Sequence, residues 1–73
     1  MRKEITLMKH TIITIKNRDS SVSQILEFKG DISIIYIGNS VTIIEMIGLN
    51  QTRQTDIILN HGQLVNVRNW GTK

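Results

Sequence analysis

The chain of 73 residues contains no cysteine, no proline and no alanine. Without cysteine, disulfides, thiolate zinc sites and iron–sulfur clusters are excluded. Without alanine, and with isoleucine as the prominent hydrophobic residue, long helices are disfavoured, because β-branched side chains lose χ1 freedom in a helix and pack well on a sheet. A chain of 73 residues can form only one small hydrophobic core, which gives marginal stability. With disulfides and thiolate metal sites excluded, oligomerisation is the usual source of additional stability that remains.

Signals for export and for membrane insertion are also missing from the sequence. The basic start runs into Glu4, Thr6, Lys9 and His10, where a secretory signal would have an apolar stretch of about 7 to 15 residues. The apolar run at 34–37 is far shorter than the ~20 residues that cross a bilayer. We therefore expect one small β domain over 1–73, cytoplasmic and with no membrane partner.

Residues of catalytic type are few and scattered. The six carboxylates show no readable pairing, and His10 and His61 lie far apart with no second ligand at a recognised spacing. The five glycines are isolated, whereas a phosphate-binding loop needs several close together. The sequence thus predicts no catalytic residues, no metal site and no cofactor, and a protein that is not an enzyme.

The first half of the chain reads as β-structure with one ambiguous segment. Alternating polarity predicts one strand over 5–16, with Ile5, Leu7, Ile13 and Ile15 on one face. Turn-forming residues follow at 17–21. The segment 22–29 fits a strand slightly better than a helix, and a short helix at about 20–29 is the alternative.

The clearest signal is a hairpin over 32–47. Gly38 and Asn39 separate two isoleucine-rich runs, and glycine at the first position suits a type II′ turn. The predicted register pairs Tyr36 with Val41, Ile34 with Ile43 and Ile32 with Glu45. The face that these residues share should form the core. Glu45 on this face either sits at the rim, pairs with a lysine or arginine, or marks a one-residue error in the register, and a buried functional carboxylate with a raised pKa is the alternative.

The second half reads as a polar loop at 48–54, a short strand at 56–59, a turn at 60–62 and a last strand at 63–68. Trp70 is expected to fold back over the end of the core. The predicted fold class is all-β, an antiparallel barrel or small sandwich of five to six short strands.

The other face of the central hairpin is too apolar to be fully solvated. One short chain has little material to cover it, so we expect a second subunit to do so, unless 20–29 forms a covering helix. The predicted interface residues are Ile35, Ile37, Ile44 and Met46. The predicted function is a non-enzymatic protein-interaction or assembly module, homo-oligomeric, of the kind that could serve as a phage or mobile-element regulator or inhibitor and bind another protein.

The alternative function is a small basic module that binds RNA or DNA. The formal charge is +3, and basic residues are concentrated in the first quarter of the chain. The candidate nucleic-acid contacts are Lys9, Lys16, Arg18, Arg53 and Arg68. With only three aromatic residues, Trp70 with Arg68 is the one stacking pair that the sequence offers.

Three short segments resemble pieces of the tryptophan RNA-binding attenuation protein. They are 47–49 followed by 52–56 (Ile-Gly-Leu, Thr-Arg-Gln-Thr-Asp) and 16–18 (Lys-Asn-Arg), in permuted order and over well under half of the chain. The resemblance implies an oligomeric β-ring that binds RNA through Lys16 and Arg18. It is too partial for us to assign the chain to that family.

Overall fold

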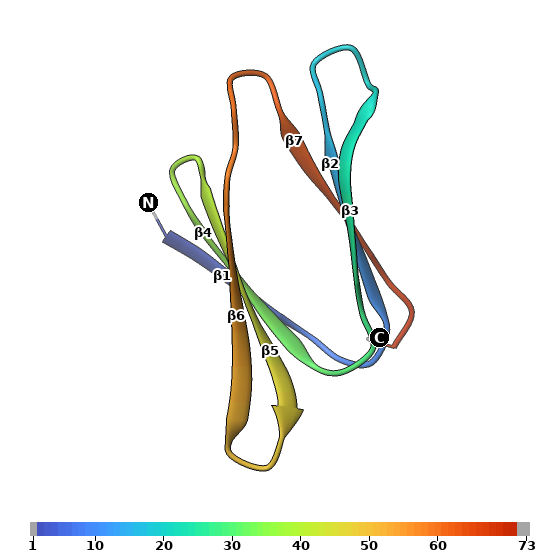
Figure 1. The fold of residues 1–73 in the computed structure, drawn as a ribbon, viewed down its shortest axis with the longest axis vertical. Helices are drawn as coiled ribbons and strands as arrows, with labels where there is room; N and C mark the ends of the chain where they lie inside the picture. Colours follow the sequence, from blue (N-terminus) through green and yellow to red (C-terminus); the bar gives the residue numbers. More distant parts are fainter. Residues whose placement is uncertain (1, 72–73) are drawn as a thin grey trace.

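The computed structural model describes residues 2–71 as two antiparallel sheets packed face to face (Figure 1). The strands are β1 (Arg2–Leu7), β2 (Thr11–Lys16), β3 (Val22–Phe28), β4 (Ile32–Ile37), β5 (Ser40–Gly48), β6 (Gln51–Ile58) and β7 (Leu64–Asn69). One sheet has the order β1-β4-β5-β6 and the other β3-β2-β7. The all-β prediction is confirmed, although the strands number seven and the sheets form an open sandwich. No helix among the described residues is long and apolar enough to span a membrane.

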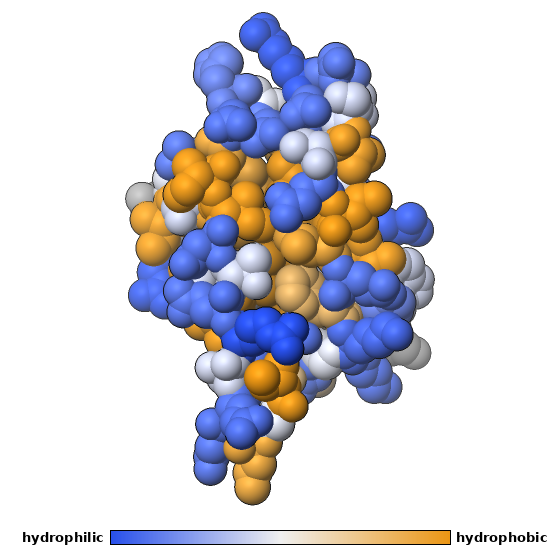
Figure 2. All heavy atoms as spheres, viewed as in Figure 1, coloured by the Kyte–Doolittle hydropathy of each residue, from blue (hydrophilic) through white to orange (hydrophobic). Residues whose placement is uncertain are grey.

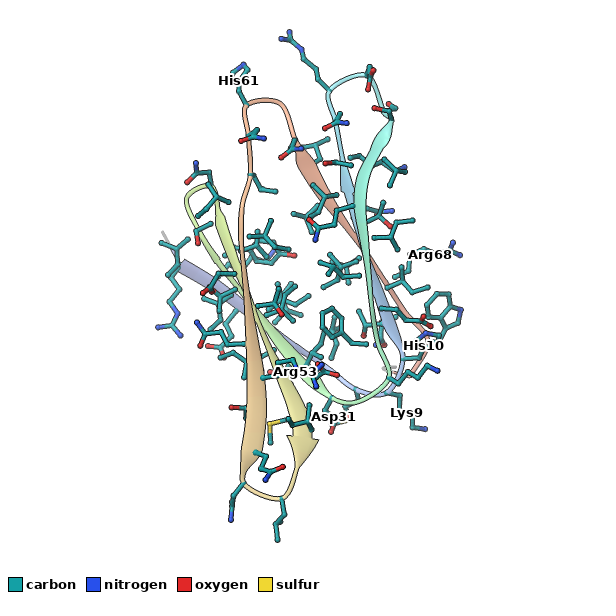
Figure 3. The ribbon with its side chains drawn as sticks, in the orientation of Figure 1. Lys9, His10, Asp31, Arg53, His61 and Arg68 are labelled. Carbon is teal, nitrogen blue, oxygen red and sulfur yellow. The ribbon has the colours of Figure 1, made fainter. Side chains whose placement is uncertain are left out.

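The core lies between the two sheets, where the inward side chains of both meet (Figure 3). Its buried hydrophobic members are Ile13, Ile15, Phe28, Ile32, Ile34, Val41 and Ile43. Each strand contributes alternate residues because side-chain direction reverses at every step along a strand. The outward residues of both sheets are thereby left on two opposite outer surfaces.

The central hairpin is built as predicted. The observed register pairs Tyr36 with Val41, Ile34 with Ile43 and Ile32 with Glu45. Gly38 has a φ of 58°, the positive value that the first position of a type II′ turn requires. The strand interpretation of 22–29 is also confirmed, and the alternative of a helix at about 20–29 is wrong because β3 pairs with β2 there.

The prediction of one strand over 5–16 is wrong. The chain forms β1 and β2 in different sheets, with a corner at residues 8–10 where Lys9 has a φ of 64°. The Asn69 amide fixes this corner by donating to the carbonyl oxygen of Met8 and to Thr11 Oγ1, both at 2.8 Å. The inward residues are odd-numbered on both sides of the corner, which is why the pattern is compatible with one strand, although the apolar alternation lapses at 8–12, where Lys9 takes an odd position.

The prediction of a loop at 48–54 is also wrong. β5 continues to Gly48 and β6 begins at Gln51, so that only residues 49 and 50 form the turn. The short strand predicted at 56–59 is the end of β6. The first half of β6 is polar because it lies at a sheet edge with most of its side chains exposed, and such a strand needs no apolar alternation.

The last strand follows the predicted turn, in which Gly62 has a φ of 84°. Val65 and Val67 pack against the core from β7. Trp70 does not fold over the core as expected, since it is 55% exposed and lies against His10 and Arg68. The pairing of Thr11 with Asn69 places Trp70 beside His10, on the outer side of the sheet.

Candidate interaction surfaces

The outer surface of the four-stranded sheet gathers apolar side chains from three strands, and we call it the apolar face. Its members are Ile35 and Ile37 from β4, Ile44 and Met46 from β5, and Ile58 from β6. All four predicted interface residues therefore lie on one side of one sheet. Ile58 is a fifth member that the sequence pattern does not reveal. Alternation predicts a strand over 56–59 but does not show that this strand pairs with β5.

The apolar face is open to solvent. Ile37 is 53% exposed, Met46 52% and Ile58 64%, while Ile35 and Ile44 are half-buried by their neighbours on the sheet. The other side of the sheet faces the core, and β3 occupies the segment that could have formed a covering helix. Within residues 2–71, no segment lies over this face.

The outward positions of this sheet carry three charged groups among the described residues, Arg2, Glu4 and Asp56. Arg2 and Glu4 form an ion pair at 3.4 Å on β1. The Asp56 carboxylate accepts hydrogen bonds from Thr42 Oγ1 at 2.9 Å and from the Gln54 amide at 3.2 Å. The donors to Asp56 are neutral, so the face carries one unpaired negative charge, which lies on the edge strand β6.

The outer surface of the three-stranded sheet has a different character, and we call it the cationic face. It presents Lys16 from β2 and Arg68 from β7. His10 and Trp70 lie where the corner meets the C-terminal segment, and Figure 3 shows His10 and Arg68 on this side of the molecule. The Arg68 guanidinium lies 5.4 Å from the centre of the Trp70 ring. The His10 ring lies 5.0 Å from the same indole on a centroid-to-centroid measure. An exposed indole thus sits between a cation and an imidazole.

Glu27 is the acidic group of this cationic cluster. Its Oε2 lies 2.5 Å from His10 Nε2, with both side chains near the surface. The register explains the contact. Ile12 pairs with Glu27 on β3 and with Arg68 on β7, and His10 lies two residues before Ile12 on the same side of the sheet, next to both partners. His10 and Trp70 are far apart in sequence, so only the β2–β7 register could have predicted their contact.

The structure separates the five candidate nucleic-acid contacts. Lys16 and Arg68 share the cationic face, and Lys9 lies at the corner next to His10. Arg18 lies in the β2–β3 turn, with its side chain packed against Gly62. Arg53 belongs to the other sheet, where it pairs with Glu45 at 3.7 Å.

Glu45 lies at the rim of the core face beside an arginine, as the sequence suggested. Two other ionisable groups have altered pKa values. Burial raises the pKa of the Tyr36 hydroxyl above its ordinary 10.0. Hydrogen bonds from the Ser21 hydroxyl and then from the Ser21 backbone N–H lower the pKa of Asp19 below 3.8, at the turn next to the cationic face.

Comparisons with protein-family models, with curated proteins and with solved structures find no match to this chain. Among residues 2–71 there is no cluster of three or more histidine and acidic side chains arranged to hold a metal ion. The two outer faces are therefore the features from which a function can be argued.

Proposed function

We propose that the chain is a self-assembling β-module whose subunits meet through the apolar face. The observation that carries the proposal is a sheet face on which Ile37, Met46 and Ile58 are each more than half exposed around a half-buried centre. Patches of this kind on small soluble domains commonly mark interaction sites. The sequence-based expectation of a homo-oligomer through Ile35, Ile37, Ile44 and Met46 leads to the same surface.

A second copy of the chain is the partner that the charges favour. In a two-fold interface each face meets itself, so uncompensated like charges would repel. On the apolar face Arg2 is paired with Glu4, so that Asp56, hydrogen-bonded to Thr42, is the one unpaired charge among the described outward residues. On the cationic face Glu27 contacts His10, so that Lys16 and Arg68 are left without an acidic partner and would repel the like charges of a second copy more strongly.

The size of the core supports the same proposal. The seven buried hydrophobic residues give one small core, and domains of this length bury only roughly 60% of their unfolded surface. Burying the exposed half of an isoleucine side chain contributes about 1 kcal/mol. Association through five such residues would add stability that rises with protein concentration.

The test is to replace Ile35 and Ile37 together by lysine and to measure mass by size exclusion with light scattering. We expect the wild-type chain to be an oligomer and the Ile35→Lys/Ile37→Lys variant to be a folded monomer. The matched control is Val22→Lys/Leu64→Lys, which places two lysines at exposed aliphatic positions outside the apolar face and should leave the mass unchanged. A monomeric wild-type chain, or an unchanged oligomer in the first variant, would refute the proposal.

Nucleic-acid binding on the cationic face is the second candidate, and one observation favours it. Trp70 is exposed and carries Arg68 over its ring, so that a base could stack on the indole while the guanidinium approaches a phosphate. Lys16 on the same face and Lys9 at the corner could contact neighbouring phosphates.

This second function can be tested by titrating the chain with a fluorescein-labelled single-stranded oligonucleotide, RNA or DNA, at several salt concentrations. Binding through the cationic face requires an affinity that falls with salt and a Trp70→Ala variant that binds roughly ten-fold or more weakly. An Arg53→Ala variant, changed on the other sheet, is the control. Equal losses in both variants would place the binding elsewhere.

A further inference from the structure

The end of the β5–β6 hairpin projects beyond the rest of the four-stranded sheet, and we call residues 46–52 the arm (Figure 1). Pairing between β4 and β5 ends with Ile32 and Glu45. Beyond that pair the ladder continues between β5 and β6 only, through Met46–Thr52 and Gly48–Gln51. In the described part of the chain the arm is thus a two-stranded ribbon.

The root of the arm is fixed to the body of the protein. The Met46 N–H donates to the Asp31 carbonyl at 3.0 Å. Gly30 approaches the Met46 carbonyl so closely that a Cβ on Gly30 would lie 3.1 Å from that oxygen. The Glu45–Arg53 ion pair spans the two strands at the same level. The arm therefore leaves the sandwich in a defined direction.

The tip of the arm is apolar where a solvated turn would be polar. Leu49 is 92% exposed, Ile47 46% and Met46 52%. The space-filling view shows this end as a projection with hydrophobic atoms at its extremity (Figure 2). An isolated two-stranded ribbon is marginally stable in water. The exposed apolar tip gives it hydrophobic area that a partner could bury.

We infer that the arm packs against a second copy of the chain as a continuation of the apolar-face interface. This inference rests on the proposed self-association. Met46 belongs to both the apolar face and the arm, so the two surfaces are continuous. Residues 46–52 carry no charged side chain, and Glu45 and Arg53 at the root compensate each other, so the arm would not repel a copy.

The surface area that a stable complex must bury also favours contact between the arm and a second copy of the chain. A standard interface buries about 800 Å² on each partner and involves roughly 20 residues a side. Five half-exposed apolar side chains on the sheet supply only part of that area, and association itself costs at least about 4 kcal/mol. The arm supplies further exposed apolar area through Ile47 and Leu49, at the end of the sheet beyond Met46.

A single cysteine introduced at the tip gives a direct test, because the chain has no cysteine of its own. Leu49→Cys is made in the wild-type background and in the Ile35→Lys/Ile37→Lys background, and the rate of reaction with a maleimide is measured for each. We expect the tip thiol to react at least about ten-fold more slowly in the oligomer, since a thiol reacts according to its exposure. A Ser20→Cys variant, in the β2–β3 turn, should react at equal rates in both backgrounds.

The outcomes separate the arm from the face. A tip thiol that is protected in the oligomer and reactive in the monomer supports the inference. An oligomer with a fully reactive tip thiol overturns the inference and leaves the apolar-face proposal in place, whereas a monomeric wild-type chain overturns both. Protection that is found only on adding neutral phosphatidylcholine vesicles would assign the tip to a lipid surface and overturn the inference as well. Should the double-lysine variant not fold, dilution of the wild-type background supplies the monomer.

Discussion

The two outer faces of this sandwich are made from similar strands but differ in charge. The apolar face combines five apolar side chains with the Arg2–Glu4 ion pair and one unpaired carboxylate, Asp56. The cationic face has exposed aliphatic residues too, among them Ile25 and Leu64, but Lys16 and Arg68 lie among them. The difference teaches that a few charged residues at outward positions decide which of two hydrophobic surfaces can meet its own copy.

The largest expected effect separates the inside of the sandwich from the apolar face on a single strand. Ile43 is fully buried and the adjacent Ile44 points outward. Ile43→Ala should lower the free energy of unfolding by about 2–5 kcal/mol, because it leaves a cavity. Ile44→Ala, measured by urea unfolding of the dissociated subunit, should cost less than about 1.5 kcal/mol. Equal losses would mean that the apolar face is buried within the subunit.

The next effect compares the same substitution on the two faces. Ile58 and Ile25 are 64% and 63% exposed, and they lie on opposite outer surfaces. Ile58→Lys should weaken self-association by roughly ten-fold or more, because a buried unpaired charge is costly. Ile25→Lys should change it by less than about two-fold. Sedimentation equilibrium measures both, and a reversed order would make the cationic face the interface.

A smaller effect concerns the Arg68–Trp70 stack. Arg68→Met and Lys16→Met each remove one positive charge from the cationic face, but only Arg68 lies over the indole. Arg68→Met should cost about 0.5–1 kcal/mol of stability and alter the fluorescence of Trp70, the single tryptophan of the chain. Lys16→Met should leave that fluorescence unchanged. The same change in both variants would show that net charge, not stacking, sets the environment of Trp70.

The smallest effect is a pH dependence at the turn next to the cationic face. The folded pKa of Asp19 lies below its ordinary 3.8 because the Ser21 hydroxyl and backbone N–H donate to the carboxylate. The folded state therefore binds this proton less readily than the unfolded state. The resulting stabilisation is present above about pH 4 and is lost as the pH falls through the lowered value. Asp19→Asn should reduce the change of the urea midpoint with pH between about pH 5 and pH 2. An unchanged pH dependence in this variant would show that Asp19 is not its source.

The sequence is informative where local pattern and turn chemistry agree. The hairpin at Gly38 and Asn39 is predictable with its register, and that register places Ile34 and Ile43 inside and Ile35 and Ile44 outside. The predicted interface set shares one face for the same reason. These features depend only on alternation and on one glycine with a positive φ.

The features that the sequence does not reveal depend on contacts between distant segments. The corner at Lys9 divides between two sheets a segment whose inward residues are odd-numbered on both sides of the corner, and the Asn69 amide that fixes it comes from the last strand. The arm resembles a loop in sequence because β6 begins with polar residues on an edge. The position of Trp70 away from the core is not predictable, because its neighbour His10 can be identified only from the β2–β7 register.

That same register also has a consequence for how the molecule folds as it is made. β2 pairs with β7, which is the last of the seven strands among the described residues, so Asn69, the partner of Thr11, is synthesised after the other six strands. Until then β2 has one open edge, and Val65 and Val67 are missing from the core. Folds dominated by such distant pairings form slowly, in roughly milliseconds to seconds. During that interval the open edge of one nascent chain can accept the β7 strand of another, which makes crowded synthesis a route to strand-swapped dimers.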